Sequence, residues 1–226
     1  MDAFLFGVFP YLAVAVTVVG ALRRFGAMRD TVTTSSSQML ESRLQHWGSV
    51  SWHYAILLIL LAHLAAVLLP GAVAGALSSP GRLVVIEVTG LALGLTALAG
   101  LVLLGVRRLT LRGETTWLDW TVMLLLLVQV ATGVLVAVMA RWGLSWFLYT
   151  ATPWLGSLAR FSPRVDLMSV MPWPLKLHAV NAFLLVALVP FTRLAHALVA
   201  PVEYLWRIPQ VVIWRRPRPT PAGGPR

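Results

Sequence analysis

The chain has 226 residues and a formal net charge of +10, although only 12% of its residues are charged. Apolar residues make up 58% and the mean hydropathy is +0.81, which excludes an ordinary soluble domain and favours a polytopic helical membrane protein. The lack of cysteine excludes disulfides, thiolate-bound iron–sulfur clusters, cysteine zinc sites and covalently attached c-type haem.

Five segments are apolar over the roughly 20 residues that a membrane-spanning helix needs. They are Ala3–Leu22, Ser51–Leu69, Leu83–Val106, Trp117–Ala140 and Leu175–Ala200. Their unbroken apolar runs differ from the short alternating strands of a membrane β-barrel. The sequence therefore predicts an all-α fold with five transmembrane helices.

The first of these spans is predicted to be an uncleaved helix. Asp2 is the only charge before it and arginines follow it, which reverses the charge order of a signal peptide.

The basic residues are distributed unequally between alternate loops. The richer set is Arg23, Arg24, Arg29, Arg43, Arg107, Arg108, Arg112, Arg207, Arg215, Arg216, Arg218 and Arg226. The loops of the other side hold Arg82, Arg141, Arg160, Arg164 and Lys176. Since arginine-rich loops stay in the cytoplasm, the N-terminus is predicted outside and the C-terminus inside. The same spread over several loops argues against nucleic-acid binding.

Two domains are expected: an integral membrane domain over residues 1–206 and a Pro/Arg-rich cytoplasmic tail over 207–226. The tail holds five prolines and cannot form a packed core, so it should be extended or disordered. It could supply surface charge or dock a partner. The aromatic-rich loop from Arg141 to Pro174 is expected to contain a helix in the membrane interface.

Lesser features of the spans have ordinary explanations. Gly90, Gly94 and Gly100 of the third span predict close helix packing. Trp117 and Asp119, at the start of the fourth, are interpreted as belt and cap residues.

Four of the five histidines lie in two of the spans. His53 and His63 are in the second, and His178 and His196 are in the fifth, whereas His46 lies outside and is given no role. A lone histidine in a helix is usually structural, but ionisable residues in a bilayer are expensive and are functional candidates. Two levels of imidazole on two helices suit two haem irons, each held by one histidine from each helix.

The antiparallel course of the two spans predicts the pairing. His63 would meet His178 near the outer face, and His53 would meet His196 near the cytoplasm. The helical rise gives about 15 Å between the first two histidines but about 27 Å between the second two. Inclined haems and a kink at Pro190 are needed to take up the difference.

The order and spacing of further motifs carry a family resemblance. They are Phe9-Pro10-Tyr11, Ser36-Ser37-Gln38-Met39-Leu40, Arg107-Arg108-Leu109, Lys176-Leu177-His178, Pro190-Phe191-Thr192-Arg193-Leu194 and Pro201-Val202-Glu203-Tyr204-Leu205. With the four histidines, they extend over nearly the whole chain. The chain resembles the gamma subunit of respiratory nitrate reductase, a membrane di-haem cytochrome b.

The resemblance implies two haem b groups, with His63 and His178 as the outer axial ligands and His53 and His196 as the inner ones. It also implies oxidation of quinol, menaquinol or ubiquinol, near the outer haem beside Arg82. Some members have lysine there, so arginine keeps the charge but changes the hydrogen-bond geometry.

The family further implies electron transfer to an iron–sulfur beta subunit and a molybdenum-containing alpha subunit that reduces nitrate. Both would dock on the cytoplasmic side of a prokaryotic inner membrane.

Two alternatives stay open. One is a related di-haem cytochrome of a sulfur-metabolism reductase, against which the motifs at Ser36–Leu40 and Pro201–Leu205 favour nitrate. The other is a haem-free transporter that uses its histidines for protons or metal ions.

Overall fold

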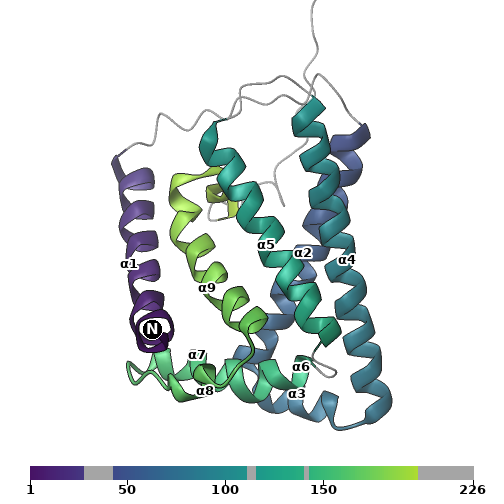
Figure 1. Cartoon of the computed structure of the whole chain (residues 1–226), viewed down its shortest axis with the longest axis vertical. Coiled ribbons are helices and arrows are strands. Elements are labelled where there is room, and N and C mark those ends of the chain that lie inside the picture. Colours follow the sequence, from purple (N-terminus) through teal and green to yellow (C-terminus); the bar gives the residue numbers. More distant parts are fainter. Residues whose placement is uncertain (28–42, 111–115, 140–142, 198–226) are drawn as a thin grey trace, which may run out of the picture.

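The computed structural model describes residues 1–27, 43–110, 116–139 and 143–197 (Figure 1). Within these ranges the chain is helical and contains no strand. Five helices are long and apolar enough to cross a membrane: Phe4–Leu22, Leu44–Leu68, Pro80–Thr110, Trp117–Met139 and Trp173–Phe191. The predicted all-α fold with five spans is confirmed. The motifs Ser36–Leu40 and Pro201–Leu205 and the tail 207–226 lie outside the described residues.

The long helices follow the predicted spans with shifted ends. The first span consists of a π-helical turn η1 (Phe4–Val8) and helix α1 (Phe9–Leu22), and a second π-helical turn η2 (Arg23–Ala27) follows it. The next three are α2 (Arg43–Leu68), α4 (Pro80–Thr110) and α5 (Trp117–Met139). Proline begins α4 because the first turn of a helix does not need its N–H.

Short helices occupy the connections at one end of the bundle. Helix α3 (Pro70–Leu77) joins α2 to α4. Between α5 and helix α9 (Trp173–Leu188) lie α6 (Gly143–Trp146), η4 (Phe147–Ala151), α7 (Thr152–Ala159) and α8 (Asp166–Ser169). Figure 1 shows them lying across the lower ends of the long helices, beside the N-terminus. We call this the capped end. The opposite end, which carries Arg23, Arg24, Arg107 and Arg108, is the basic end.

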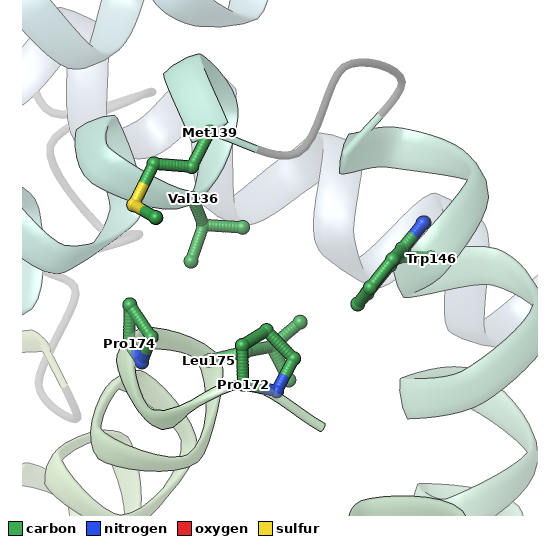
Figure 2. A pocket seen from close by; sticks show the side chains of 6 residues that line it. All are labelled: Val136, Met139, Trp146, Pro172, Pro174 and Leu175. Carbon is green, nitrogen blue, oxygen red and sulfur yellow. The ribbon is translucent and has the colours of Figure 1, made fainter. Parts of the chain in front are cut away.

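An apolar cavity of about 240 Å³ lies at the capped end (Figure 2). It is lined by Val136, Met139, Trp146, Pro172, Pro174 and Leu175. These residues come from the end of α5, from α6 and from the start of α9, so the cavity lies where the short helices meet two spans.

The long helices pack in the order α2, α4, α5, α9, α1, with the closest contact between α2 and α4. Gly100 allows that contact, since a Cβ there would lie 2.7 Å from the backbone nitrogen of Trp52. Gly94 meets Val134 of α5, whereas a Cβ on Gly90 would face open space. The predicted close packing thus holds at two of the three glycines. Within the described residues α2 packs mainly on α4 rather than on α9, so the second and fifth spans are not direct packing partners.

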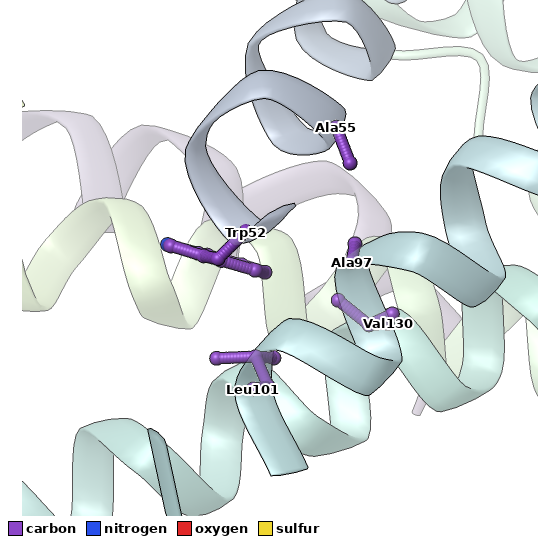
Figure 3. Packing of buried hydrophobic residues seen from close by; sticks show 5 residues of the cluster. All are labelled: Trp52, Ala55, Ala97, Leu101 and Val130. Atoms are coloured by element: carbon purple, nitrogen blue, oxygen red, sulfur yellow. The ribbon is translucent and has the colours of Figure 1, made fainter. Parts of the chain in front are cut away.

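Two apolar clusters hold the bundle. The first joins α2, α4 and α5 and consists of Trp52, Ala55, Ala97, Leu101 and Val130 (Figure 3). The second lies at the capped end and consists of Phe6, Trp154, Leu158 and Met168. There the Trp154 indole donates to the Phe6 carbonyl at 2.9 Å, so its polar group is satisfied. This second cluster fixes the short helices to the start of the first span.

The fifth span is not one continuous helix. Helix α9 (Trp173–Leu188) passes into a 3-10 turn η5 (Val189–Phe191), then Thr192 is extended and a second turn η6 (Arg193–Ala197) follows. The predicted helix Leu175–Ala200 is therefore wrong for the described residues from Val189 to Ala197. Proline at position 190 cannot donate the next helical hydrogen bond, and its ring clashes with the preceding turn. His178 and His196 thus do not share one straight helix, and the rise that separated them by about 27 Å does not apply.

Candidate functional site

The four histidines of the spans lie at two levels. His53 of α2 and His196 of η6 lie toward the basic end. His63 lies ten residues further along α2 toward the capped end, and His178 is in the first turns of α9. These are the levels that the sequence predicted.

At the level nearer the basic end, the rings of His53 and His196 approach each other. Their centroids are 6.1 Å apart and their planes are inclined by 61°. A metal–imidazole bond is about 2 Å long and the ring centre lies about 1 Å behind the nitrogen, so two imidazoles on one metal have centres about 6 Å apart. The observed separation therefore fits two imidazoles that bind one metal from opposite sides. Within the described residues, the two elements that carry these rings, α2 and η6, are not close packing partners.

In each of the four histidines, Nδ1 lies within hydrogen-bond distance of a backbone carbonyl oxygen. The acceptors are Ser49 O for His53 (2.7 Å), Ile59 O for His63 (2.8 Å), Gln129 O for His178 (3.0 Å) and Arg193 O for His196 (2.6 Å). A proton on Nδ1 that is donated to a carbonyl leaves the Nε2 lone pair for a metal and fixes the ring orientation. The donor set therefore fits haem iron at the level of His53 and His196.

The second level is arranged differently. The His63 ring packs edge-on against Phe147 with centroids 4.6 Å apart. Nε2 of His178 accepts a hydrogen bond from the Gln129 side-chain amide at 3.0 Å. Ligation by His178 would require the Gln129 amide to turn away.

Arg82 lies at the start of α4, at the capped end. Its guanidinium donates to Ala76 O at 3.0 Å, to Gly75 O at 3.1 Å and to Ser78 Oγ at 3.2 Å. These acceptors belong to the end of α3, whose carbonyls have no partners within the helix. Arg82 is thus held at the level of the short helices, with the cationic group directed to α3 rather than to a histidine.

Comparison with known proteins assigns the chain to a family. The sequence model described as Nitrate reductase gamma subunit matches residues 2–215. The chain belongs to the nitrate reductase gamma subunit family. The resemblance inferred from the motifs is confirmed over nearly the whole length.

Sequence similarity to individual proteins supports the same family assignment. The nitrate reductase gamma chain of Bacillus subtilis is 30% identical over 219 residues, covering 94% of this chain and 97% of the relative. The respiratory nitrate reductase 1 gamma chain of Escherichia coli is 31% identical over 221 residues, with the same coverage. The nitrate reductase-like protein NarX of Mycobacterium tuberculosis is 35% identical over 209 residues. This chain spans only 32% of the length of NarX.

In this gamma-subunit family member, sequence reasoning missed a polar network around His178. The Asn181 amide donates to Leu125 O at 2.9 Å and to Gln129 Oε1 at 2.7 Å, and Thr132 Oγ1 lies 3.1 Å from His178 Nδ1. Gln129 and Thr132 are three residues apart in the apolar second half of α5, so they share a face. That spacing was the available signal, because polar side chains within a span need partners.

Proposed function

We propose that this chain is the membrane cytochrome b subunit of a respiratory nitrate reductase, a quinol-oxidising subunit of the complex. The observation that carries the proposal is the ring pair His53–His196, at the spacing of two axial ligands and with both Nδ1 atoms fixed. Membership of the gamma subunit family supports it independently.

His53 and His196 would hold one haem b, and His63 and His178 the other. When bound, these groups supply one-electron transfer between the two levels. The chain would fix the imidazoles through their Nδ1 hydrogen bonds to backbone carbonyls.

Quinol, menaquinol or ubiquinol, would bind at the capped end near His63 and His178. Arg82 can offer a charged donor to a quinol oxygen once it leaves the end of α3. The apolar cavity beside Leu175 suits part of an isoprenoid chain, because sites for a whole small molecule usually measure about 300–1,000 Å³. The quinol protons would leave on the outer side.

The basic end would face the cytoplasm of a prokaryotic inner membrane, in accordance with the distribution of arginine. An iron–sulfur beta subunit would dock there and pass electrons to a molybdenum-containing alpha subunit, where nitrate is reduced. Electrons that move inward oppose the resting potential by about 2.3 kcal/mol per 100 mV. Quinol oxidation must supply that work, so the reaction is electrogenic.

Single substitutions of the histidines test this function. His63→Ala and His196→Ala should each remove one of two b-type signals from the reduced visible spectrum of the membrane-bound protein. His46→Ala is the matched control, because His46 is exposed and contacts Trp47, and it should keep both signals. Two intact signals in both span variants would refute the assignment, and a wild-type protein without any b-type band would favour a haem-free transporter.

A further inference from the structure

Asp119 is a buried carboxylate with two roles. It lies in the first turn of α5 and is only 9% exposed. Its Oδ2 accepts the Thr116 backbone N–H at 3.2 Å, and its own N–H donates to Thr116 Oγ1 at 3.3 Å, which is a capping box. Its Oδ1 lies 3.0 Å from Arg193 Nε and 3.8 Å from Arg108 Nη2. The helix cap therefore uses Oδ2 of Asp119, whereas Oδ1 forms the ion pairs with the two arginines.

Arg193 connects this carboxylate to a histidine. Its backbone carbonyl accepts the Nδ1 hydrogen bond of His196 at 2.6 Å. One residue thus binds Asp119 with its side chain and orients His196 with its main chain. Asp119 belongs to α5 and His196 to η6, so the link crosses between two elements.

The segment that carries His196 needs such outside support. After Pro190 the chain leaves the α-helix, and a 3-10 turn as short as η6 supplies few hydrogen bonds of its own. Arg24 Nη1 donates to the carbonyls of Pro190 at 2.7 Å and Thr192 at 3.4 Å. Arg24 therefore fixes the start of the segment from η2, and Asp119 fixes its continuation from α5.

We propose that Asp119 is a positioning residue that sets the orientation of His196 opposite His53, through the side chain and carbonyl of Arg193. The inference rests on the proposed function, because His196 matters in this way only as a haem ligand. Pairing with Arg193 and Arg108 also compensates the burial of the carboxylate, which would otherwise be costly.

The test uses variants of the full chain in its membrane, with its partner subunits. Arg193→Ala removes the ion pair but keeps the main-chain carbonyl and the Asp119 cap, so α5 keeps its start. Asp119→Asn removes the charge. The control is Asp166→Asn, since Asp166 pairs with Arg164 at 3.1 Å on the surface, at 66% and 58% exposure.

The measurement is the low-spin EPR signal of each b-type centre, which depends on the angle between the two imidazole planes. Arg193→Ala and Asp119→Asn should displace the signal that His196→Ala removes, and should leave the other signal in place. The double variant should displace it no further than either single variant, because both act through one link. Asp166→Asn should move neither signal.

An unmoved signal in Arg193→Ala would overturn the proposal, even if Asp119→Asn fails to accumulate. Equal loss of both signals in the two variants would also overturn it, because that result indicates general destabilisation. Failure of the proposed function looks different, since His196→Ala would then leave both b-type signals intact.

Discussion

His178 lies against α5 at a position where that helix has no side chain. A Cβ on Gly133 would lie 3.1 Å from Cε1 and 3.6 Å from Nδ1 of the imidazole. The ring is held there by Gln129 and Thr132. The His178 ring can therefore take this orientation because residue 133 is glycine, and the hydrogen bonds then hold it there.

Gly133→Ala should shift or remove the b-type signal that His178→Ala removes, because the added methyl must displace the ring. Gly90→Ala is the control, since a Cβ on Gly90 meets nothing within 4 Å. Visible and EPR spectra of the two variants check the prediction. An unchanged pair of signals in Gly133→Ala would show that the ring does not occupy this position in the loaded protein.

Among single residues, the sequence predicted the four histidines and their two levels, and their role as ligands stays a prediction. It did not predict the second role of Asp119. The capping position is visible as Thr116 followed by Asp119, but the ion pair joins residues 74 positions apart, which only the tertiary structure brings together. Arg82 has structural contacts with α3 that its charge alone could not indicate.

At the scale of elements, the contact of α2 with α4 positions the helix that carries His53 and His63. Gly48 and Gly100 face each other across it, and Trp52, next to His53, packs over Gly100 (Figure 3 shows this tryptophan beside Leu101). Close backbone approach replaces the hydrophobic driving force that is lacking between helices in lipid.

Gly100→Ala should separate the two helices, since the new Cβ would lie 2.7 Å from the Trp52 nitrogen and 2.9 Å from the Gly48 carbonyl oxygen. Both are backbone atoms that cannot turn away, so we expect a destabilisation of about 1–3 kcal/mol. Gly105→Ala, on the same helix in open space, should be neutral or slightly stabilising. Thermal unfolding in detergent measures both, and equal melting temperatures would contradict the packing described.

The helices themselves were largely predictable from apolar runs, and their ends were not. The sequence anticipated a kink at Pro190, but not that the chain would continue through an extended residue and a 3-10 turn. That path depends on Arg24 of another element, which binds the carbonyls released there. The connection between the second and third spans also contains a helix, Pro70–Leu77, because its alanines and leucine favour one.

At the scale of the whole molecule, the two ends differ in charge and construction. One carries the arginines of α4 and η2, and the other carries the short helices and the apolar cavity. The sequence predicted this asymmetry through the positive-inside rule, and the bundle is consistent with it because alternate connections meet at the same end. The direction in the membrane remains a prediction.

Labelling of single cysteines tests that direction, since the chain has no cysteine of its own. Ser162→Cys places an exposed thiol at the capped end, and Thr110→Cys places one at the end of α4. A membrane-impermeant reagent should label the first in intact cells and the second only after permeabilisation. The reverse pattern would contradict the proposed orientation.

The central claim, that α2 and the fifth span hold two haems between them, is tested most directly by haem content and signal identity together. The wild-type chain should bind two haem b groups. His53→Ala and His196→Ala should each remove the same signal, and His63→Ala and His178→Ala should each remove the other. Loss of different signals in His53→Ala and His196→Ala, or two haems retained in all four variants, would contradict the account.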